Sequence, residues 1–127
     1  MVTGIKFSIK FVMKARAGYF CFFITLNIKT VEARIDEYSD WLAETNPDVL
    51  KAIFEKMLVD SGFGILNFAE HHFEPQGYTG LWMVSESHFA IHTFPEENKT
   101  YIHLSSCNRT MYFKFLDKLK EYKGGST

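Results

Sequence analysis

A short stretch of this 127-residue chain concentrates residue types that can do chemistry. Residues 85–96 read Ser-Glu-Ser-His-Phe-Ala-Ile-His-Thr-Phe-Pro-Glu, and a cysteine follows at Cys107. Hydroxyls and thiols can act as nucleophiles, and an imidazole is a base that works near neutral pH. The spacing of polar and apolar residues predicts a strand that ends in a turn at Pro95. The candidate chemistry therefore centres on Ser87, His92 and Cys107.

The order of these residues resembles the prokaryotic S-adenosylmethionine decarboxylases. The resemblance rests on Glu86-Ser87-His88, on residues 91–96, and on a cysteine twenty positions after the serine. An upstream block, residues 71–80 (HHFEPQGYTG), is similar to that family's His-x-Phe-x-Pro-x-Gly-x-Ser-Gly. The match is strong from about Phe68 to Cys107 and is at the level of the fold elsewhere.

The resemblance implies that Ser87 is the precursor of a covalently bound pyruvoyl group. Its hydroxyl would attack the carbonyl of Glu86, and β-elimination from the resulting ester would break the chain. The products would be a β chain, 1–86, and an α chain, 87–127, that begins with pyruvoyl. This group can form a Schiff base with an amine substrate and act as an electron sink. The alternative is an ordinary surface serine at a strand end.

The same resemblance gives roles to three more residues. His92 would be the base that removes the α-proton of Ser87 during processing. Cys107 would donate a proton to the substrate carbon after carbon dioxide leaves, and it would also support processing. Thr79, at the position of the family's serine, keeps a hydroxyl that supports processing. Taken singly, His92 fits a buried histidine with satisfied hydrogen bonds, and Cys107 fits a small buried side chain.

Substrate binding is expected at three further positions. In the family, the phenylalanine at Phe73 stacks on the adenine, and the aromatic residue at Phe94 lines the same pocket. The glutamate at Glu96 would bind polar groups of the substrate, such as ribose hydroxyls. Aromatic faces also attract the positive charge of a sulfonium. With thirteen phenylalanines in the chain, the alternative for Phe73 and Phe94 is a place in the core.

Two other kinds of site are disfavoured. His88 and His92 have the spacing of a zinc-binding helix, but the glutamate after the first histidine is missing and the segment is expected to be extended. We therefore predict no metal site. A serine hydrolase is disfavoured because no nucleophile-elbow sequence surrounds a serine.

The chain departs from the family pattern at several places. Asn108 follows the cysteine where glycine is usual, and His103 stands where an aspartate is expected. The family continues past the last helix into another strand, which this chain lacks. An extra N-terminal strand, Ile5 to Met13, is predicted to take an edge of the sheet by pairing with Tyr19 to Ile28.

Length and composition favour one domain covering 1–127. A hydrophobic content of 46% predicts a packed core, and a net charge of −1 gives no reason to expect nucleic acid or membranes as partners. Two cysteines do not form a disulfide framework and suit a reducing compartment, so we expect a cytoplasmic protein. A secretory signal is disfavoured because Ile5 to Phe11 alternates strictly and no small-residue cleavage site follows.

Local patterns predict the elements that position the site. Helical spacing suggests a short helix within Thr30 to Thr45, and Asn46-Pro47-Asp48 opens a clear helix that Gly62 stops. Strands are expected at 63–68, 80–84 and 99–106, with a turn at 74–77. Asn108 or Thr110 would cap a last helix, with 123–127 as a frayed tail.

Together these elements predict an α+β fold, an antiparallel sheet with helices packed on one face. The resemblance makes it an S-adenosylmethionine decarboxylase-like α/β sandwich that forms a homodimer sheet to sheet, with sites at the interface. The predicted function is pyruvoyl-dependent decarboxylation of S-adenosylmethionine for spermidine synthesis, after autocatalytic serinolysis at Glu86-Ser87. The alternatives are a pyruvoyl-dependent arginine or ornithine decarboxylase, and an unprocessed, non-catalytic paralogue that binds or regulates a partner.

Overall fold

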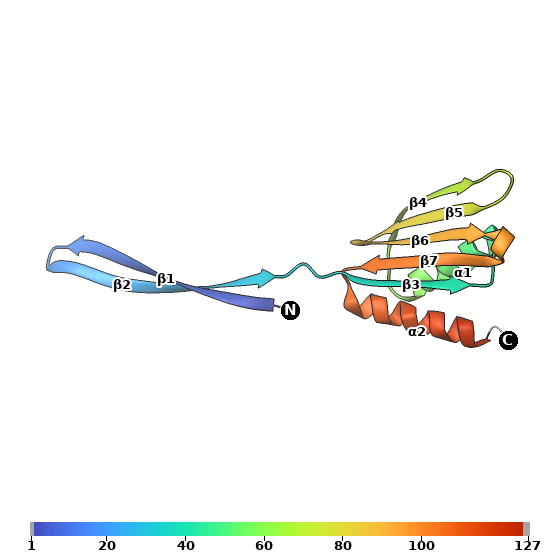
Figure 1. Cartoon of the computed structure of the whole chain (residues 1–127). Coiled ribbons are helices and arrows are strands. Elements are labelled where there is room, and N and C mark those ends of the chain that lie inside the picture. The colour runs from blue at the N-terminus through green and yellow to red at the C-terminus, as the bar shows by residue number, and fades with distance from the viewer. Residues whose placement is uncertain (1, 126–127) are drawn as a thin grey trace. The chain divides into compact units, whose positions relative to one another are not determined.

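A computed structural model describes the backbone of residues 2–125 and, in the first two strands, the side chains of residues 6, 8–14, 16–19, 21 and 25. The chain divides into two compact units, Met1–Arg34 and Ile35–Thr127. Their elements are labelled in Figure 1. The single domain expected over 1–127 stays a prediction, and the two units are described separately.

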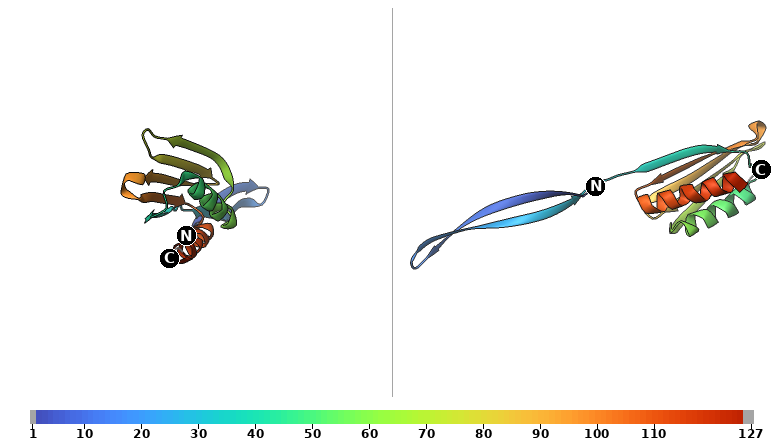
Figure 2. Two further views of the ribbon diagram at one scale, coloured as in Figure 1. Left: turned by 90° about the vertical axis from the view of Figure 1, so that its right-hand side faces the viewer. Right: turned by 90° about the horizontal axis from the view of Figure 1, so that it is seen from below.

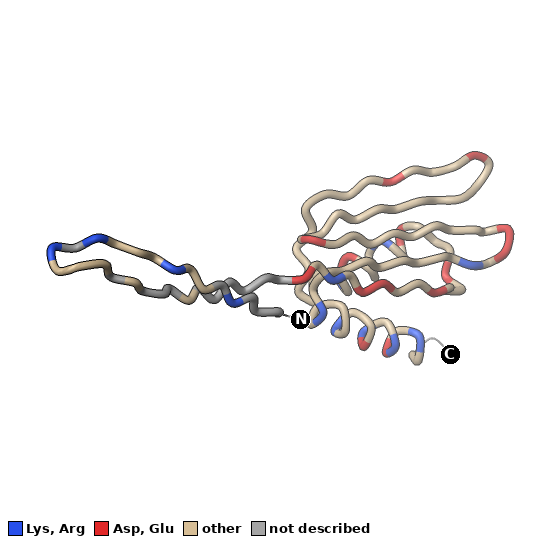
Figure 3. Tube along the Cα trace, turned by 60° about the vertical axis from the view of Figure 1, so that its left-hand side comes forward, with Lys and Arg blue, Asp and Glu red and all other residues tan. Residues whose placement is uncertain are grey.

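The first unit is a hairpin of β1 (Val2–Ala15) and β2 (Gly18–Val31). Gly18 has a φ of +130°, a conformation that suits glycine in the connecting turn. The pairing itself confirms the predicted hairpin, but its predicted place at the edge of the main sheet is wrong. The two strands form a separate two-stranded sheet. Residues 1–34 hold six Lys or Arg and one Asp or Glu, and Figure 3 shows the blue positions along the hairpin.

The second unit is built on a five-stranded antiparallel sheet in the order β3-β7-β6-β5-β4. Its strands are β3 (Asp36–Leu42), β4 (Ile65–His72), β5 (Tyr78–Val84), β6 (Ser87–Phe94) and β7 (Lys99–Ser106). A 3-10 turn, η1 (Pro95–Glu97), joins β6 to β7. The strand that carries the candidate chemistry, β6, is therefore central and paired on both sides.

Two helices, α1 (Pro47–Asp60) and α2 (Arg109–Gly125), cover the same face of this sheet (Figure 2). Asn46 caps α1, because its side-chain oxygen accepts the amide protons of Asp48 and Val49 at 3.0 and 3.2 Å. Asn108 caps α2 in the same way, accepting the amide proton of Met111 at 3.0 Å. The other face of the sheet carries no helix of the second unit, and we call it the open face.

The core lies between the sheet and the two helices. Phe89 in the middle of β6 is fully buried, and its ring lies 4.7 Å from that of Phe54 in α1 and 5.3 Å from that of Phe115 in α2. Trp82 of β5 packs against Phe89 at 5.6 Å. Burying one such side chain contributes about 2–3 kcal/mol. The alternate residues of β6 face the opposite way, so His88, Ala90, His92 and Phe94 lie on the open face.

Most predicted elements are confirmed, including the α+β class with helices on one face. β7 has the expected bounds, and α1 begins at Pro47 as predicted. The helix expected within Thr30–Thr45 is wrong, because residues 36–42 form β3. Tyr38 and Leu42 fit helical spacing, but they also fit the period of two that places alternate residues toward the core. The frayed tail expected from Lys123 onward is also wrong for residues 123–125, because α2 continues to Gly125. Ser126 and Thr127 lie outside the described residues.

Candidate functional site

The Glu86-Ser87 bond lies at a tight turn between two central strands. β5 ends at Val84 and β6 begins at Ser87, and the Cα atoms of these two residues are partners in the sheet. Glu86 in the turn has a φ of 57°, in the left-handed region that residues with a Cβ atom rarely adopt. The bond predicted to break therefore joins a residue with a strained backbone to the first residue of a buried strand.

The Ser87 hydroxyl is held by the neighbouring strand. Ser87 and Ser106 are Cα partners between β6 and β7, and Ser87 Oγ donates a hydrogen bond to Ser106 Oγ at 3.0 Å. Ser106 Oγ donates in turn to the carbonyl oxygen of Asn108 at 3.2 Å and accepts the amide proton of Asn108 at 3.1 Å. Sequence spacing does not point to Ser106, because its place opposite Ser87 depends on the register of β7.

Cys107 lies at the end of β7, next to the same turn. Its thiol donates a hydrogen bond to the carbonyl oxygen of Glu86 at 3.0 Å and lies 3.5 Å from a carboxylate oxygen of the same residue. Desolvation and the hydrogen bond to Glu86 raise the pKa of the Cys107 thiol. At neutral pH the sulfur therefore keeps its proton and can donate it.

A second group of predicted residues meets at the other end of β6. A cavity of about 350 Å³ is lined by Phe73, Gln76, Gly77, Tyr78, Thr79, His92, Thr93, Phe94 and Glu96. Phe73 and Phe94 are 50% and 36% exposed, so both rings are available to a ligand rather than part of the core. The Gln76 side chain donates to a carboxylate oxygen of Glu96 at 3.5 Å. The cavity thus brings together the three predicted substrate-binding residues and two predicted processing residues.

His92 is oriented within this cavity by two neighbours. Thr79 is its partner on β5, and Thr79 Oγ1 lies 2.8 Å from His92 Nδ1. On the other side, the ring of Tyr101 stacks on the imidazole at 6.3 Å between centroids. Burial lowers the pKa of His92, so the imidazole is neutral at pH 7 and can accept a proton. Tyr101 is the register partner of His92 on β7, a position that sequence spacing could not identify.

The two groups lie far apart within one chain. Five residues of strand separate Ser87 from His92, which corresponds to roughly 16 Å at the usual rise per residue. Because the separation is odd, the two side chains also point to opposite faces of the sheet. Glu86, Ser87 and Cys107 form one cluster, and Phe73, Thr79, His92, Phe94 and Glu96 form another. We call them the cleavage cluster and the pocket cluster.

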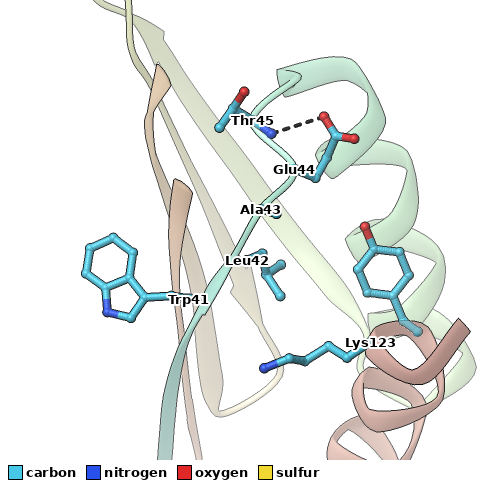
Figure 4. A pocket seen from close by; sticks show the side chains of 7 residues that line it. Trp41, Leu42, Ala43, Glu44, Thr45 and Lys123 are labelled. Carbon is cyan, nitrogen blue, oxygen red and sulfur yellow. Dashed lines mark hydrogen bonds between the residues drawn. The ribbon is translucent and has the colours of Figure 1, made fainter. Parts of the chain in front are cut away.

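Another cavity, of about 470 Å³, lies between the end of β3 and the end of α2 (Figure 4). Two of its polar side chains already have partners. A carboxylate oxygen of Glu44 accepts the amide protons of Thr45 and Asn46 at 3.0 and 2.8 Å, and Lys123 pairs with Asp40. None of the residues lining this cavity is a predicted site residue, and it lies outside both clusters.

Among the described residues, no group of three or more His, Cys, Asp or Glu side chains is placed to hold a metal ion. Within the same part of the chain, no helix has the length and apolar character needed to cross a bilayer.

The fold matches that of a known class of enzymes. A search of solved structures found the adenosylmethionine decarboxylase from Aquifex aeolicus VF5, with a TM-score of 0.52 and 17% sequence identity. The match covers 66% of this chain and 72% of that protein, and it supports the fold alone.

Sequence comparison identifies the family. The sequence model of the S-adenosylmethionine decarboxylase family matches residues 37–125, and the chain belongs to this family. The S-adenosylmethionine decarboxylase proenzyme of Prochlorococcus marinus (strain MIT 9313) is 38% identical over 65 residues, which are 50% of this chain and 52% of that protein. The proenzyme of Geobacillus kaustophilus (strain HTA426) is 35% identical over 80 residues, which are 63% of this chain and 64% of that protein. The matches thus span about half to two thirds of the relatives' length.

Proposed function

We propose that this chain is the proenzyme of a pyruvoyl-dependent S-adenosylmethionine decarboxylase and that it cleaves itself between Glu86 and Ser87. The observation that carries the proposal is the geometry of the cleavage cluster. The scissile carbonyl oxygen accepts a hydrogen bond from Cys107 at 3.0 Å, and the Ser87 hydroxyl is held by a buried neighbour. The product, decarboxylated S-adenosylmethionine, would serve spermidine synthesis.

Cleavage begins with an N-to-O acyl shift. The Ser87 oxygen bonds to the carbonyl carbon of Glu86, and negative charge develops on the carbonyl oxygen that the Cys107 thiol already contacts. The carbon–nitrogen bond then breaks, and the hydroxyl proton ends on the freed amine. An ester now links Glu86 to the Ser87 side chain. The left-handed conformation of Glu86 favours this rearrangement, because the strained amide is replaced by a more flexible linkage.

β-Elimination completes the cut. A base removes the α-proton of Ser87, and the bond from its β-carbon to the ester oxygen breaks, which releases residues 1–86 with a free carboxylate. Hydrolysis of the dehydroalanine left on residues 87–127 releases ammonia and leaves the pyruvoyl group. Neutral His92 has the protonation state that this base requires.

The pocket cluster suits the proposed substrate. The partly exposed rings of Phe73 and Phe94 provide two aromatic faces for an adenine, and they attract a sulfonium through their π electrons. The carboxylate of Glu96 can accept hydrogen bonds from ribose hydroxyls. The pyruvoyl group supplies an electron sink for decarboxylation. Cys107, whose thiol keeps its proton, is then placed at the same turn to protonate the substrate carbon.

The separation of the two clusters favours a homodimer whose sites combine both chains. The open face exposes Leu81 and Met83, at 45% and 56%, and a cavity of about 400 Å³ lies beside Ser87 on this side of β4 and β5. Ala90 is the small residue halfway along β6. Two open faces packed about a twofold axis near Ala90 would bring the end of β6 that carries Ser87 next to the partner's pocket cluster, with the Ser87 side chain on the far side of the strand and its backbone toward the partner. His92 would then act on the Ser87 of the other chain.

The first test is the intact mass of freshly purified protein under denaturing conditions. We expect two fragments that separate between Glu86 and Ser87, with pyruvoyl blocking the second. The single full-length species of 14.8 kDa after prolonged incubation would overturn the proposal and support an uncleaved paralogue. A product assay with S-adenosylmethionine, arginine and ornithine then tests the substrate, and activity on either amino acid alone would contradict the assignment.

Mixing two inactive variants tests the shared site. Ser87→Ala keeps His92, and His92→Ala keeps Ser87, so each homodimer lacks one required group. If the sites combine both chains, mixed dimers contain one complete site, and the His92→Ala chain is cleaved after mixing. If both groups act within one chain, mixing leaves both chains intact.

A further inference from the structure

We infer that Ser106 is a positioning residue for the self-cleavage reaction, because it fixes the direction of the Ser87 hydroxyl. The inference rests on the proposed function and assigns a role to a residue outside the site expected from the sequence. Ser106 is 1% exposed and lies directly across the sheet from Ser87. It therefore acts on the nucleophile from a position that water does not reach.

The hydrogen bonds of Ser106 leave it a single role toward Ser87. A serine hydroxyl has one proton to donate and two lone pairs with which to accept. Ser106 donates its proton to the carbonyl oxygen of Asn108 and accepts the amide proton of the same residue. One lone pair remains, and the Ser87 hydroxyl fills it as a donor at 3.0 Å. All the bonding capacity of Ser106 is then used.

This arrangement prepares the Ser87 oxygen for attack. Since the Ser87 proton points at Ser106, the lone pairs of the Ser87 oxygen are directed away from Ser106, and the oxygen can approach the carbonyl carbon of Glu86. The accepting oxygen also polarises the O–H bond, an effect that is strengthened in a buried site. With the Cys107 thiol on the carbonyl oxygen, one residue orients the nucleophile and the next one in sequence activates the electrophile.

The same contacts connect the nucleophile to helix α2. Asn108 holds Ser106 through its backbone and caps α2 through its side-chain oxygen, which accepts the amide proton of Met111. The orientation of Ser87 therefore depends on correct docking of the start of α2. Because α2 supplies core residues such as Phe115, a chain that has not packed its core has not yet oriented its nucleophile.

The test compares cleavage rates of Ser106→Ala and Ser106→Thr with that of the wild type, by intact mass over time after refolding. The matched control is Ser105→Ala, since Ser105 is also buried, at 6% exposure, but occupies the neighbouring position on the other face of β7. We expect Ser106→Ala to cleave about 10-fold more slowly, the usual effect of one lost hydrogen bond to a reacting group. Ser106→Thr should retain most of the rate, and Ser105→Ala should match the wild type.

Hydroxylamine separates positioning from a general loss of structure. It cleaves esters, so it restores cleavage in a variant that forms the ester but cannot complete elimination, as expected for His92→Ala. Ser106→Ala should be slow in forming the ester, and hydroxylamine should not restore its rate. Two results would overturn the role of Ser106 alone. One is a wild type that cleaves and a Ser106→Ala variant that cleaves at the same rate. The other is a Ser106→Ala variant whose cleavage rate is restored by hydroxylamine. A wild type that never cleaves overturns the proposed function and this inference together.

Discussion

The sulfur of Cys107 lies 3.0 Å from the carbonyl oxygen of Glu86, although the two residues are 21 positions apart in the sequence. The contact joins the end of β7 to the turn between β5 and β6, and it exists because β6 pairs with both neighbours in register. If the chain cleaves itself at this bond as proposed, the protonated thiol is an oxyanion donor that is in place before the reaction starts.

Replacing Cys107 should therefore slow self-cleavage. Cys107→Ala removes the donor, and loss of one such donor lowers the rate of acyl transfer on the order of 100-fold. Cys107→Ser keeps a donor and should cleave faster than Cys107→Ala. The rates are measured by intact mass, with Cys21→Ala as the control. Equal rates in Cys107→Ala and the wild type would contradict an activating role for the thiol.

Relieving the strain at Glu86 should stabilise an uncleavable chain. A residue with a Cβ atom at a φ of 57° costs about 1–2 kcal/mol, and the greater chain entropy of glycine offsets part of the gain. In the Ser87→Ala background, Glu86→Gly should raise the free energy of unfolding by up to about 1 kcal/mol, measured by urea denaturation.

Two controls accompany this measurement. Glu86→Ala removes the carboxylate but keeps the Cβ atom, so it should give no such gain. Asn98→Gly changes the other non-glycine residue with positive φ in the described part of the chain, at 51°, and should gain less because asparagine tolerates this conformation. A larger gain at Asn98 than at Glu86 would argue against strain at the cleavage site.

The stability of the same uncleavable chain should depend on pH through His92. Burial lowers the pKa of His92 below the value of about 6.5 that it has when unfolded. The unfolded chain therefore binds the proton first, and the contribution of neutral His92, complete above pH 6.5, is lost as the pH falls through the folded pKa. His92→Gln should flatten the decline in unfolding free energy below pH 6.5. An identical pH profile would show that other groups cause it.

The ring of Phe89 should be essential for the core. It is fully buried between Phe54, Trp82 and Phe115, so Phe89→Ala leaves a cavity that two helices and the sheet cannot fill. We expect a loss of about 3–5 kcal/mol in unfolding free energy. Phe113→Ala, at a ring that is 50% exposed, should change stability by less than about 1 kcal/mol. Calorimetry of the Ser87→Ala background measures both.

A charge introduced on the open face should both separate the proposed dimer into monomers and stop self-cleavage. Leu81→Glu places a carboxylate where two sheets would meet, and burying an unpaired charge there opposes association. Val59→Glu is the control, since Val59 is 59% exposed on α1, on the helical side. Sedimentation gives the oligomeric state and intact mass gives the cleavage. A monomeric Leu81→Glu protein that still cleaves itself would contradict a site shared between chains.

Local signals account for the parts of the fold that the sequence predicts well. α1 is defined by Asn46, Pro47 and an apolar stripe, all of which act within a few residues of one another. The pattern of β3 also predicts a helix, because apolar side chains at positions 38 and 42 fit both periods. Only the pairing of β3 with β7, more than fifty residues away, distinguishes them.

The candidate site shows the same limit. Sequence similarity predicted roles for Ser87, His92 and Cys107, but spacing does not tell whether these residues meet within one chain. Strand pairing brings Cys107 into contact with the Glu86 carbonyl, whereas His92 lies at the far end of β6. Ser106 and Tyr101 could not be found, because each acts through the residue opposite it on β6, and that register is a property of the whole sheet.

The position of the proposed cleavage site determines what a cut would do to the molecule. In the order β3-β7-β6-β5-β4, the two strands after the turn lie between strands that come before it. The two fragments are thus interleaved, and neither contains a complete core. Separation of the fragments would require unfolding, so a cut protein would stay assembled. Once denatured, it would have to refold from two chains that find each other, at a rate that depends on concentration. Self-cleavage would thus replace a one-chain folding reaction with a two-chain one, and the native state would be easier to keep than to regain.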